Sequence, residues 1–453
     1  MIKYTRFFIT ILLAVIAFSA KSQSTATTSS PYSRYGLGDP IQPTLPQNVG
    51  MGGVATAINR IGGYNNINPE NPASYGAINW TTIDIGIFGS YTQLSQTGQS
   101  NQTAGNFRLS HVNFAIPVTK SSALSFGLMP YTQVGYNYTQ TVSRGYGTTD
   151  PADTNKANYI YSGDGGLNKA YFGYGFTLFK HLLLGANASY IFGNIKEYES
   201  TEYPELYGTL DTRTEQSNAI RGFNLDYGAQ YSIDFPDPQH IQNAHLVFGY
   251  SGSLGNHISS QSSYIVSQYT RDASGNENVA IDSIKYFVNP KSNIKLPQMN
   301  HFGVSYQKEN AYLIAVDYTT GKWSDLAIDG VNQGLQNSQM FNVGGQITPN
   351  VNALNNYWAL MDYRFGLTYE KTYLNEGIVN GTGSGGTNID RKAISFGIGM
   401  PLRSESGSFY KINFSAEYGQ RGTVANGLIK ENYVNFHLGI TLNDKWFRRY
   451  QFD

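Results

Sequence analysis

Polar and apolar side chains alternate along most of the chain after residue 80. In the stretch "YKINFSAEYG", Tyr410, Ile412 and Phe414 alternate with Lys411 and Asn413. Successive side chains of a β-strand point to opposite faces, so this period of two predicts strands with one apolar, aromatic face and one small or polar face. Such alternation over about ten residues is typical of a transmembrane β-barrel with an apolar outside and a polar inside.

Fourteen segments follow this pattern. They lie near 82–96, 106–118, 122–142, 166–179, 182–202, 218–234, 245–269, 293–309, 311–326, 339–349, 357–374, 387–402, 408–423 and 430–443. An even number of strands suits a closed antiparallel bacterial barrel. The connections also alternate between longer ones, such as "SRGYGTTDPADTNKANYIYSGDG", and mostly shorter ones, such as "TKSS" and "KH". Long outward loops and short periplasmic turns produce this alternation.

The predicted fold class is therefore all-β, a 14-stranded antiparallel transmembrane β-barrel over residues 81–443. The main alternative is a soluble β-sandwich. A sandwich would not explain the aromatic stripes, the export signal and the alternating loop lengths together. Charged residues expected on inward positions are Arg364, Glu370, Asp317, Lys411 and Glu417, because an Arg or Lys facing lipid at the midplane would cost roughly 2–4 kcal/mol.

Residues 23–80 have a different character. They contain "SPYSRYGLGD", a Pro-rich link and the stretch "VGMGGVATAINRIGGYNNINPENPASYG". This composition is too rich in Gly and Asn for a membrane strand and too apolar in parts for plain disorder. A barrel of fourteen strands encloses a lumen that side chains alone do not fill. We therefore expect an N-terminal hatch, or plug, inside the lumen.

The two ends of the chain are expected in the periplasm. Residues 1–22 predict a cleaved signal peptide, with Lys3 and Arg6 before an apolar run and a small-x-small site at residues 20–22. The alternative is a membrane anchor, which the run is too short to support comfortably. Residues 444–453 predict a periplasmic C-terminal tail.

Composition narrows the function classes. The chain has a formal net charge of zero, which gives no electrostatic footprint for nucleic acid. It has no cysteine, so disulfides and thiol catalysis are excluded. The seven His residues show no paired metal-ligand spacing, and no glycine-rich stretch is followed by a phosphate-loop Lys. We expect no cofactor, no metal and no enzyme activity, although a barrel hydrolase with a triad spread over strands would be invisible in sequence.

Several short motifs resemble the FadL-type family of outer-membrane transporters for long-chain fatty acids and aromatic hydrocarbons. The stretch "GVATAINRIGGYNNINPENPASYG", with Asn71, Pro72 and Ala73, is similar to the hatch of that family, and "LPQMNHFGVSYQKENAYLIAVDYTTGKWSDL" is similar to a strand–turn–strand stretch. The opening "SPYSRYGLGD" looks like a Bacteroidota-style variant. The resemblance implies that Asn71, Pro72 and Ala73 belong to a gate.

The same resemblance implies lateral exit of a hydrophobic ligand through a kinked third strand. The third predicted strand contains "SFGLMPYTQVGYNYTQTV", in which Pro130 lacks a ladder N–H and Gly127 and Gly135 permit a bend. The expected function is plug-gated, passive uptake of a small hydrophobic compound across the outer membrane, with that ligand and membrane lipid as partners. The alternatives are a structural bulge without a transport role, and an accessory or cargo-shuttle barrel with outer-membrane protein partners, as in type IX secretion.

Overall fold

The computed structural model describes residues 30–444, except 62–63, 143–154, 207, 237–242, 273, 279–281, 384 and 404–407. The predicted signal peptide and nearly all of the predicted C-terminal tail lie outside the described residues. Among the described residues, no helix combines the length and the apolar character that crossing a membrane requires.

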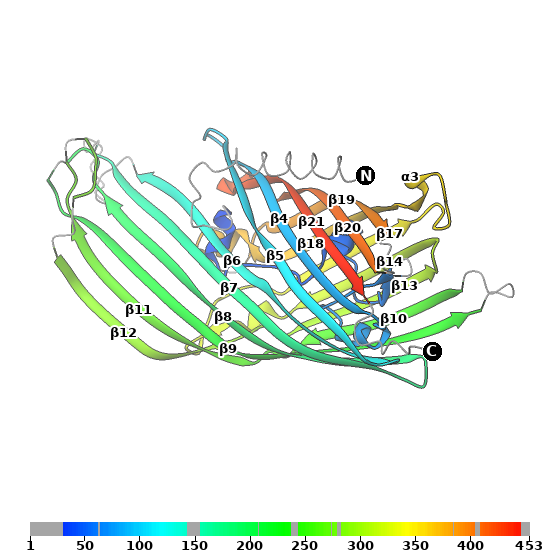
Figure 1. Cartoon of the computed structure of the whole chain (residues 1–453). Coiled ribbons are helices and arrows are strands. Elements are labelled where there is room, and N and C mark those ends of the chain that lie inside the picture. The colour runs from blue at the N-terminus through cyan, green and yellow to red at the C-terminus, as the bar shows by residue number, and fades with distance from the viewer. Residues whose placement is uncertain are drawn as a thin grey trace.

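The strands form one closed antiparallel barrel of fourteen strands (Figure 1). Twelve of these are single elements: β4 (Thr81–Ser95), β5 (Gln102–Thr119), β6 (Ser122–Val142), β7 (Ala157–Leu178), β8 (Leu182–Glu202), β9 (Asp211–Phe235), β14 (Tyr312–Gly321), β17 (Ser338–Ile347), β18 (Asp362–Asn375), β19 (Asn388–Arg403), β20 (Phe409–Arg421) and β21 (Lys430–Asp444). The last strand pairs with the first along its whole length, from Lys430 opposite Ser95 to Asp444 opposite Thr81. This pairing closes the barrel.

The seventh and eighth barrel strands are each split in two. They consist of β10 (Ala244–Ser253) with β11 (His257–Tyr269), and of β12 (Asp282–Lys295) with β13 (Met299–Lys308). We expected each to be continuous. Pro297 lies in the second break and cannot donate to a ladder, while a Cβ on Gly255 in the first break would come within 2.9 Å of the Leu296 carbonyl.

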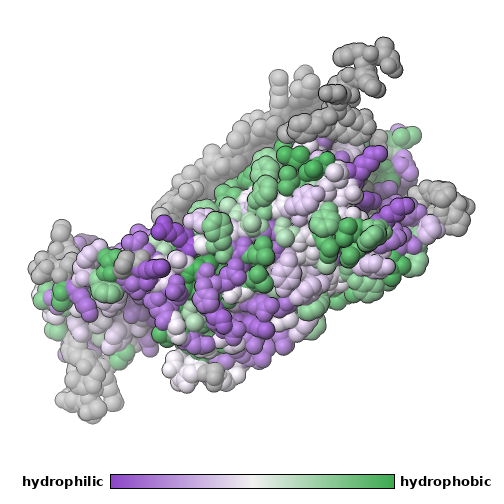
Figure 2. Space-filling view, turned by 90° about the horizontal axis from the view of Figure 1, so that it is seen from below, coloured by the Kyte–Doolittle hydropathy of each residue, from purple (hydrophilic) through white to green (hydrophobic). Residues whose placement is uncertain are grey.

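Inward and outward faces follow the predicted alternation. On β14, Leu313 is 5% exposed and Ala315 1%, whereas Ile314 is 57% exposed and Val316 47%. Of the predicted inward charges, Arg364, Asp317, Lys411 and Glu417 are buried and Glu370 is half-buried. Figure 2 shows hydrophobic side chains spread over the barrel wall, with a larger hydrophilic share toward the end where β11 and β12 lie.

Three strands begin earlier than expected, because β7, β9 and β12 extend into segments that we assigned to loops. Residues 158–165 of β7, for example, pair with both β6 and β8. The ninth strand is shorter than expected: β14 ends at Gly321, and the chain then continues through η4 (Trp323–Asp325), β15 (Ala327–Ile328) and β16 (Val331–Asn332). Trp323 is buried and stacks on Tyr373, with ring centroids 4.5 Å apart, whereas β15 pairs with β12 of the wall.

Residues 30–80, here called the N-terminal segment, pack against the inward faces of the strands (Figure 1). The segment contains η1 (Pro31–Arg34), β1 (Asp39–Pro40), α2 (Pro46–Val49), β2 (Arg60–Ile61), β3 (Tyr64–Asn65) and η2 (Pro72–Ala77). Strand glycines allow its backbone to approach the wall closely. A Cβ on Gly344 or Gly366 would overlap the backbone of Met51. The remaining short helices, α3 (Tyr357–Leu360), α4 (Glu376–Val379) and η5 (Ala425–Gly427), lie in connections between strands.

Candidate functional site: an internal cavity beside a break in the wall

The residues Asn71, Pro72 and Ala73 anchor the N-terminal segment to the wall. Asn71 is fully buried; its side-chain amide donates to the Thr56 carbonyl at 2.7 Å, and its side-chain oxygen accepts from the Ala73 N–H at 3.1 Å, which caps η2. A Cβ on Gly185 of β8 would come within 2.3 Å of the Pro72 carbonyl oxygen. These three residues therefore form a fixed contact with the barrel wall.

The ladder between β5 and β6 covers only part of the two strands. Pairing starts at Thr119 opposite Ser122 and ends at Val112 opposite Leu128. Beyond that point, residues 102–111 of β5, apart from Ser110 at a bulge, pair with β4 and have no partner on β6. We call the separation of these β5 residues from residues 130–142 of β6 the lateral gap.

The N-terminal segment occupies part of the free edge of β6. Asp39 and Pro40 of β1 pair with Gln133 and Thr132, and the N–H of the next residue, Ile41, donates to the Tyr131 carbonyl at 2.9 Å. A free strand edge is a row of unpaired backbone groups that needs a partner or a cover. Here β1, a short strand of the N-terminal segment, provides that partner.

Pro130 lies at a bulge that reverses the faces of β6. The pairing of β6 with β7 shifts register between Pro130 and Thr132. Before the bulge, Met129 packs in the interior; after it, Val134 and Tyr136 do so, which changes the inward positions from odd to even. One extra residue on one strand produces this reversal. The sequence-based prediction of a distorted third strand at Pro130 therefore agrees with the local geometry, whereas its role in exit stays a prediction.

The two glycines predicted to flank the kink have other structural roles. Gly127 lies in the regular ladder, where it pairs with both Asn113 and Tyr171, and its Cβ would overlap the Asn113 side-chain oxygen at 2.1 Å. Gly135 lies next to η1: its N–H donates to the Ser33 hydroxyl at 3.0 Å. Gly127 therefore permits close inward packing, and Gly135 holds the N-terminal segment.

A hollow of about 320 Å³ lies in the wall at the lateral gap. Three glycines line it, Gly165 and Gly166 on β7 and Gly193 on β8, together with Leu128 and Pro130. Gly165 and Gly166 have φ values of 112° and 146°, which disfavour residues with a Cβ. A Cβ on Gly165, Gly166 or Gly193 would overlap the backbone of a neighbouring residue, so these glycines allow the strands to approach closely beside this space, which we call the wall hollow.

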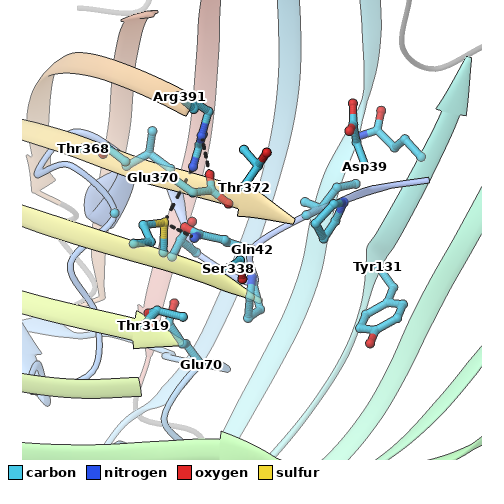
Figure 3. Close-up of a pocket in the computed structure, with 18 of the residues that line it drawn as sticks. Asp39, Gln42, Glu70, Tyr131, Thr319, Ser338, Thr368, Glu370, Thr372 and Arg391 are labelled. Carbon is cyan, nitrogen blue, oxygen red and sulfur yellow. Dashed lines mark hydrogen bonds and ion pairs between the residues drawn. The ribbon is translucent and has the colours of Figure 1, made fainter. Parts of the chain in front are cut away.

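A second space of about 360 Å³ lies inside the barrel and is called the luminal cavity (Figure 3). Figure 3 shows Asp39 and Tyr131 on one side and Glu370 and Arg391 on the opposite wall, with the N-terminal segment crossing between them. Apolar side chains contribute to its lining, among them Ile41, Val49, Phe88, Met299, Trp323 and Met340. The cavity therefore offers apolar surface beside charged groups.

Most charges that line the luminal cavity are paired. Arg391 donates to Glu370 at 2.7 Å, Arg421 to Asp39 at 2.8 Å, and Lys169 to Asp226 at 2.5 Å. The Glu431 carboxylate accepts from the Ser30 hydroxyl at 2.6 Å. Paired charges of this kind fix neighbouring strands and the N-terminal segment relative to one another.

The luminal cavity adjoins the wall hollow. Both are lined by Arg108, Ser110 and Gln133. Arg108 and Ser110 come from β5, and Gln133 comes from β6, so the boundary between the two spaces lies at the lateral gap. Arg108 was not among the residues that the sequence pattern singled out. The available signal was a lone Arg between two exposed apolar residues, Phe107 and Leu109, which places its side chain on the inward face.

At the end of the barrel that carries the short turns, a buried polar network joins β18, β20, β21 and β4. Asp362 pairs with Lys411 at 2.5 Å and with Arg364 at 2.8 Å, and Arg364 also donates to the Asn413 side chain at 2.9 Å. The network continues through Thr441, which donates to Asp84. Within the described ranges, no group of three or more side chains is arranged to hold a metal ion.

Comparisons with solved structures show the same fold. The toluene transporter TodX from Pseudomonas putida is 12% identical, with a TM-score of 0.54 over 90% of this chain and 99% of that chain. The toluene transporter TbuX from Ralstonia pickettii is also 12% identical, with a TM-score of 0.53 over 88% of this chain and 98% of that chain. A FadL homologue from Pseudomonas aeruginosa is 12% identical, with a TM-score of 0.51 over 91% of this chain and 100% of that chain. The FadL-like barrel expected from the sequence motifs is thus confirmed as a fold.

Sequence comparison assigns the family. No curated protein matches the chain. The family model described as BamG matches residues 1–453. A sequence match of this extent is independent of the structural likeness, which at this level of identity concerns the fold alone. The chain therefore belongs to the BamG family.

Proposed function

We propose that this protein is an outer-membrane channel for the passive uptake of small compounds with an apolar body. A compound enters from the side of the long loops, occupies the luminal cavity, and leaves sideways through the wall hollow next to Pro130. The single observation that carries this proposal is the end of the β5–β6 ladder at Val112 and Leu128, beside two adjoining cavities. The structural relatives named above as toluene transporters support the same class of ligand.

Sideways exit fits the chemistry of the two possible routes. The route through the turn end crosses the buried network around Asp362 and Arg364, in which each lost bond to a charged group costs about 1.5–3 kcal/mol. The route through the lateral gap passes Leu109 and Leu128, which are 51% and 42% exposed on the outer wall. An apolar compound gains free energy along the second route because it moves from the cavity into lipid.

The N-terminal segment is the proposed gate. Asp39 and Pro40 cover the edge of β6 beside the wall hollow, while Asn71, Pro72 and Ala73 hold the other half of the segment against β8 and β9. In this proposal the first part moves and the second part stays fixed. Opening then requires only the loss of a two-residue ladder and its neighbouring contacts, and not removal of the whole plug.

A reversible cross-link tests the gate. The chain has no cysteine, so Pro40→Cys with Thr132→Cys creates a single pair, placed directly opposite each other on β1 and β6. Directly opposite residues of an antiparallel pair have Cα atoms about 4.5–5.5 Å apart, which lies within the Cα separation that a disulfide spans. Val304→Cys with Val316→Cys is the matched control, because this pair lies opposite on β13 and β14 with both side chains on the outer wall.

Uptake of radiolabelled toluene and dodecanoate by intact cells is the measurement. We expect oxidation to stop uptake through the P40C/T132C barrel and reduction to restore it, with the control pair unaffected. Equal uptake by the oxidised and reduced forms of the P40C/T132C barrel would contradict the gate and lateral exit. Absence of uptake by every form, including the unmodified barrel, would favour the non-transporting accessory alternative.

A further inference from the structure

The connection between β17 and β18 differs from the short turns at the same end of the barrel. It spans residues 348–361, here called the rim segment, whereas the turns after β5, β7 and β13 span only residues 120–121, 179–181 and 309–311. Its sequence, "TPNVNALNNYWALM", contains no charged residue. Charged side chains are among those most often exposed to water. A long connection without any of them therefore points to a partner other than water.

Hydrogen bonds hold the rim segment in one shape. The Thr348 hydroxyl donates to the Asp362 carboxylate at 2.8 Å at its base, and the Asn350 N–H donates to the Ala359 carbonyl at 2.8 Å across its middle. The Asn350 carbonyl in turn accepts from the Ala353 N–H at 3.3 Å. Because backbone groups on both sides of the segment are paired, the side chains that it exposes are presented in a fixed arrangement.

Three large side chains of the rim segment are exposed. Leu354 is 87% exposed, Trp358 69% and Tyr357 44%. Apolar side chains of this size are normally withdrawn from water, and several of them on one short segment mark a site of contact with another molecule or with a membrane. Trp and Tyr in particular are enriched where a membrane protein meets the interface between lipid and water.

Two tyrosine hydroxyls place the rim segment on the outer side of the wall. The Tyr363 side chain points outward from β18, and its hydroxyl donates to the Trp358 carbonyl at 3.0 Å. The Tyr357 hydroxyl donates to the Pro401 carbonyl near the end of β19 at 3.2 Å. Figure 1 shows α3 beside the ends of β17 and β19. The segment therefore lies against the outside of the barrel and does not cover its opening.

The outer wall next to α3 is apolar as well. Ile347 at the end of β17, Tyr363 at the start of β18 and Leu402 near the end of β19 are all exposed on it. These positions belong to the lipid-facing alternation of their strands. The exposed side chains of the rim segment continue this surface, which favours lipid over a protein as the partner that covers them.

We propose that the rim segment is an interfacial anchor, which places Leu354, Tyr357 and Trp358 in the head-group region of the lipid leaflet at the turn end of the barrel. Aromatic rings with a polar edge suit this region, and the uncharged amides of the asparagines bond to head groups and water. Because the anchor lies on one side of the barrel, it fixes the depth of β17, β18 and β19 in the leaflet. This surface lies away from both cavities, so the inference goes beyond the proposed function and does not rest on uptake.

A depth measurement tests the anchor. The chain has no cysteine, so Leu354→Cys provides a single site for an environment-sensitive nitrobenzoxadiazole label. The labelled full-length barrel is reconstituted in phospholipid liposomes that carry a nitroxide either near the head group or deep in the acyl chain, or that contain iodide in the water on both sides. We expect the head-group nitroxide to quench the label at least about twofold more strongly than the deep nitroxide or iodide, since the interface is the preferred location of such a segment.

Two labelled controls bracket this depth. Val316→Cys lies on the outer wall of β14, and the deep nitroxide should quench its label most strongly. Asn276→Cys lies in the exposed connection between β11 and β12, and iodide should quench its label most strongly. A measurement without a dye uses Trp358 itself. Its fluorescence, taken as the difference between the unmodified barrel and Trp358→Phe, should be blue-shifted relative to Trp in water and quenched by lipids that are brominated near the head group.

Three results would overturn the anchor. Iodide quenching of the Leu354→Cys label as strong as that of the Asn276→Cys label would mean that the rim segment faces water. Strongest quenching by the deep nitroxide would contradict the interfacial location. A label that iodide reaches in pure lipid but not in isolated outer membranes would mean that a protein covers the segment. None of these results bears on uptake, which the cross-link between β1 and β6 tests separately.

Discussion

Val112 and Leu128 form the last pair of the β5–β6 ladder, and beyond them the two strands follow different neighbours. β5 continues along β4, whereas β6 continues along β7 and receives Asp39 and Pro40 on its other side. The ladder thus joins β5 to β6 at the turn end, whereas further out β1 pairs with β6 and no pairing among the described residues joins it to β5. Each ladder bond contributes about 0.5–1.5 kcal/mol net in water, and more where lipid offers no replacement partner.

Filling the wall hollow will block exit without unfolding the barrel. Leu128→Trp adds volume at a lining residue whose side chain already lies on the outer wall. Aromatic residues suit strand positions of this kind, so we expect unchanged heat-induced mobility shifts on gels and a large drop in toluene uptake. Phe126→Trp is the control, two residues earlier on the same face and outside the hollow. Equal uptake by the two variants would argue against this exit.

Removing the carboxylate of the turn-end network will destabilise the barrel. Asp362→Asn leaves the buried cations Lys411 and Arg364 without their anion, and breaking one partner of a buried ion pair costs about 3–5 kcal/mol. We expect a lower unfolding temperature in a gel-shift assay. Adding Lys411→Met should recover part of the loss, because it restores the original net charge of the cluster. A double variant less stable than Asp362→Asn would contradict this account.

Loss of Arg421 will loosen the outer half of the N-terminal segment. Arg421 pairs with Asp39 at 2.8 Å and lies over the Tyr32 ring, 5.0 Å from its centre. For Arg421→Gln we expect faster hydrogen–deuterium exchange in residues 30–42, measured by mass spectrometry, and unchanged exchange around the Asn71 anchor. Lys295→Gln, which breaks an ion pair on the loop side, provides the comparison. Faster exchange at both places would mean that the segment moves as one unit.

Topology follows from the alternation of long and short connections. A protease site inserted next to Asn276, an exposed residue in the connection between β11 and β12, should be cut in intact cells. The same site inserted next to Asn310, in the short turn between β13 and β14, should be protected until the outer membrane is permeabilised. The reverse pattern would invert the direction of every strand.

The barrel itself could be predicted because its alternation has a simple physical cause. Where one face meets lipid and the other meets a packed interior, the period of two is strong, and the predicted segments 122–142 and 182–202 match β6 and β8. The early starts of β7, β9 and β12 escaped prediction. There the strands continue into sequence rich in Gly, Ser, Asn and charged residues, so no alternation marks them as strands.

The site was predictable only in part. Pro130 is visible in the sequence because proline interrupts any ladder, and a bulge is present there. The strand that covers the edge of β6 could not be predicted from the sequence, since a two-residue strand at Asp39 and Pro40 carries no periodic signal. Arg108 was missed for a different reason: spacing along one strand shows that a charge faces inward, but not whether another strand supplies its counter-ion.

The contacts of the N-terminal segment also set an order for folding. The Ser30 hydroxyl bonds to the Glu431 carboxylate across 401 positions of sequence, and the Tyr32 hydroxyl bonds to the Ile429 carbonyl across 397. The first residues that the structure describes therefore complete their contacts only after the last strand is in place. Contacts of such high sequence separation form slowly, because chain entropy is lost before they form. Until then the free edge of β6 is open to other strands, and a delay in closing the barrel would expose it to aggregation.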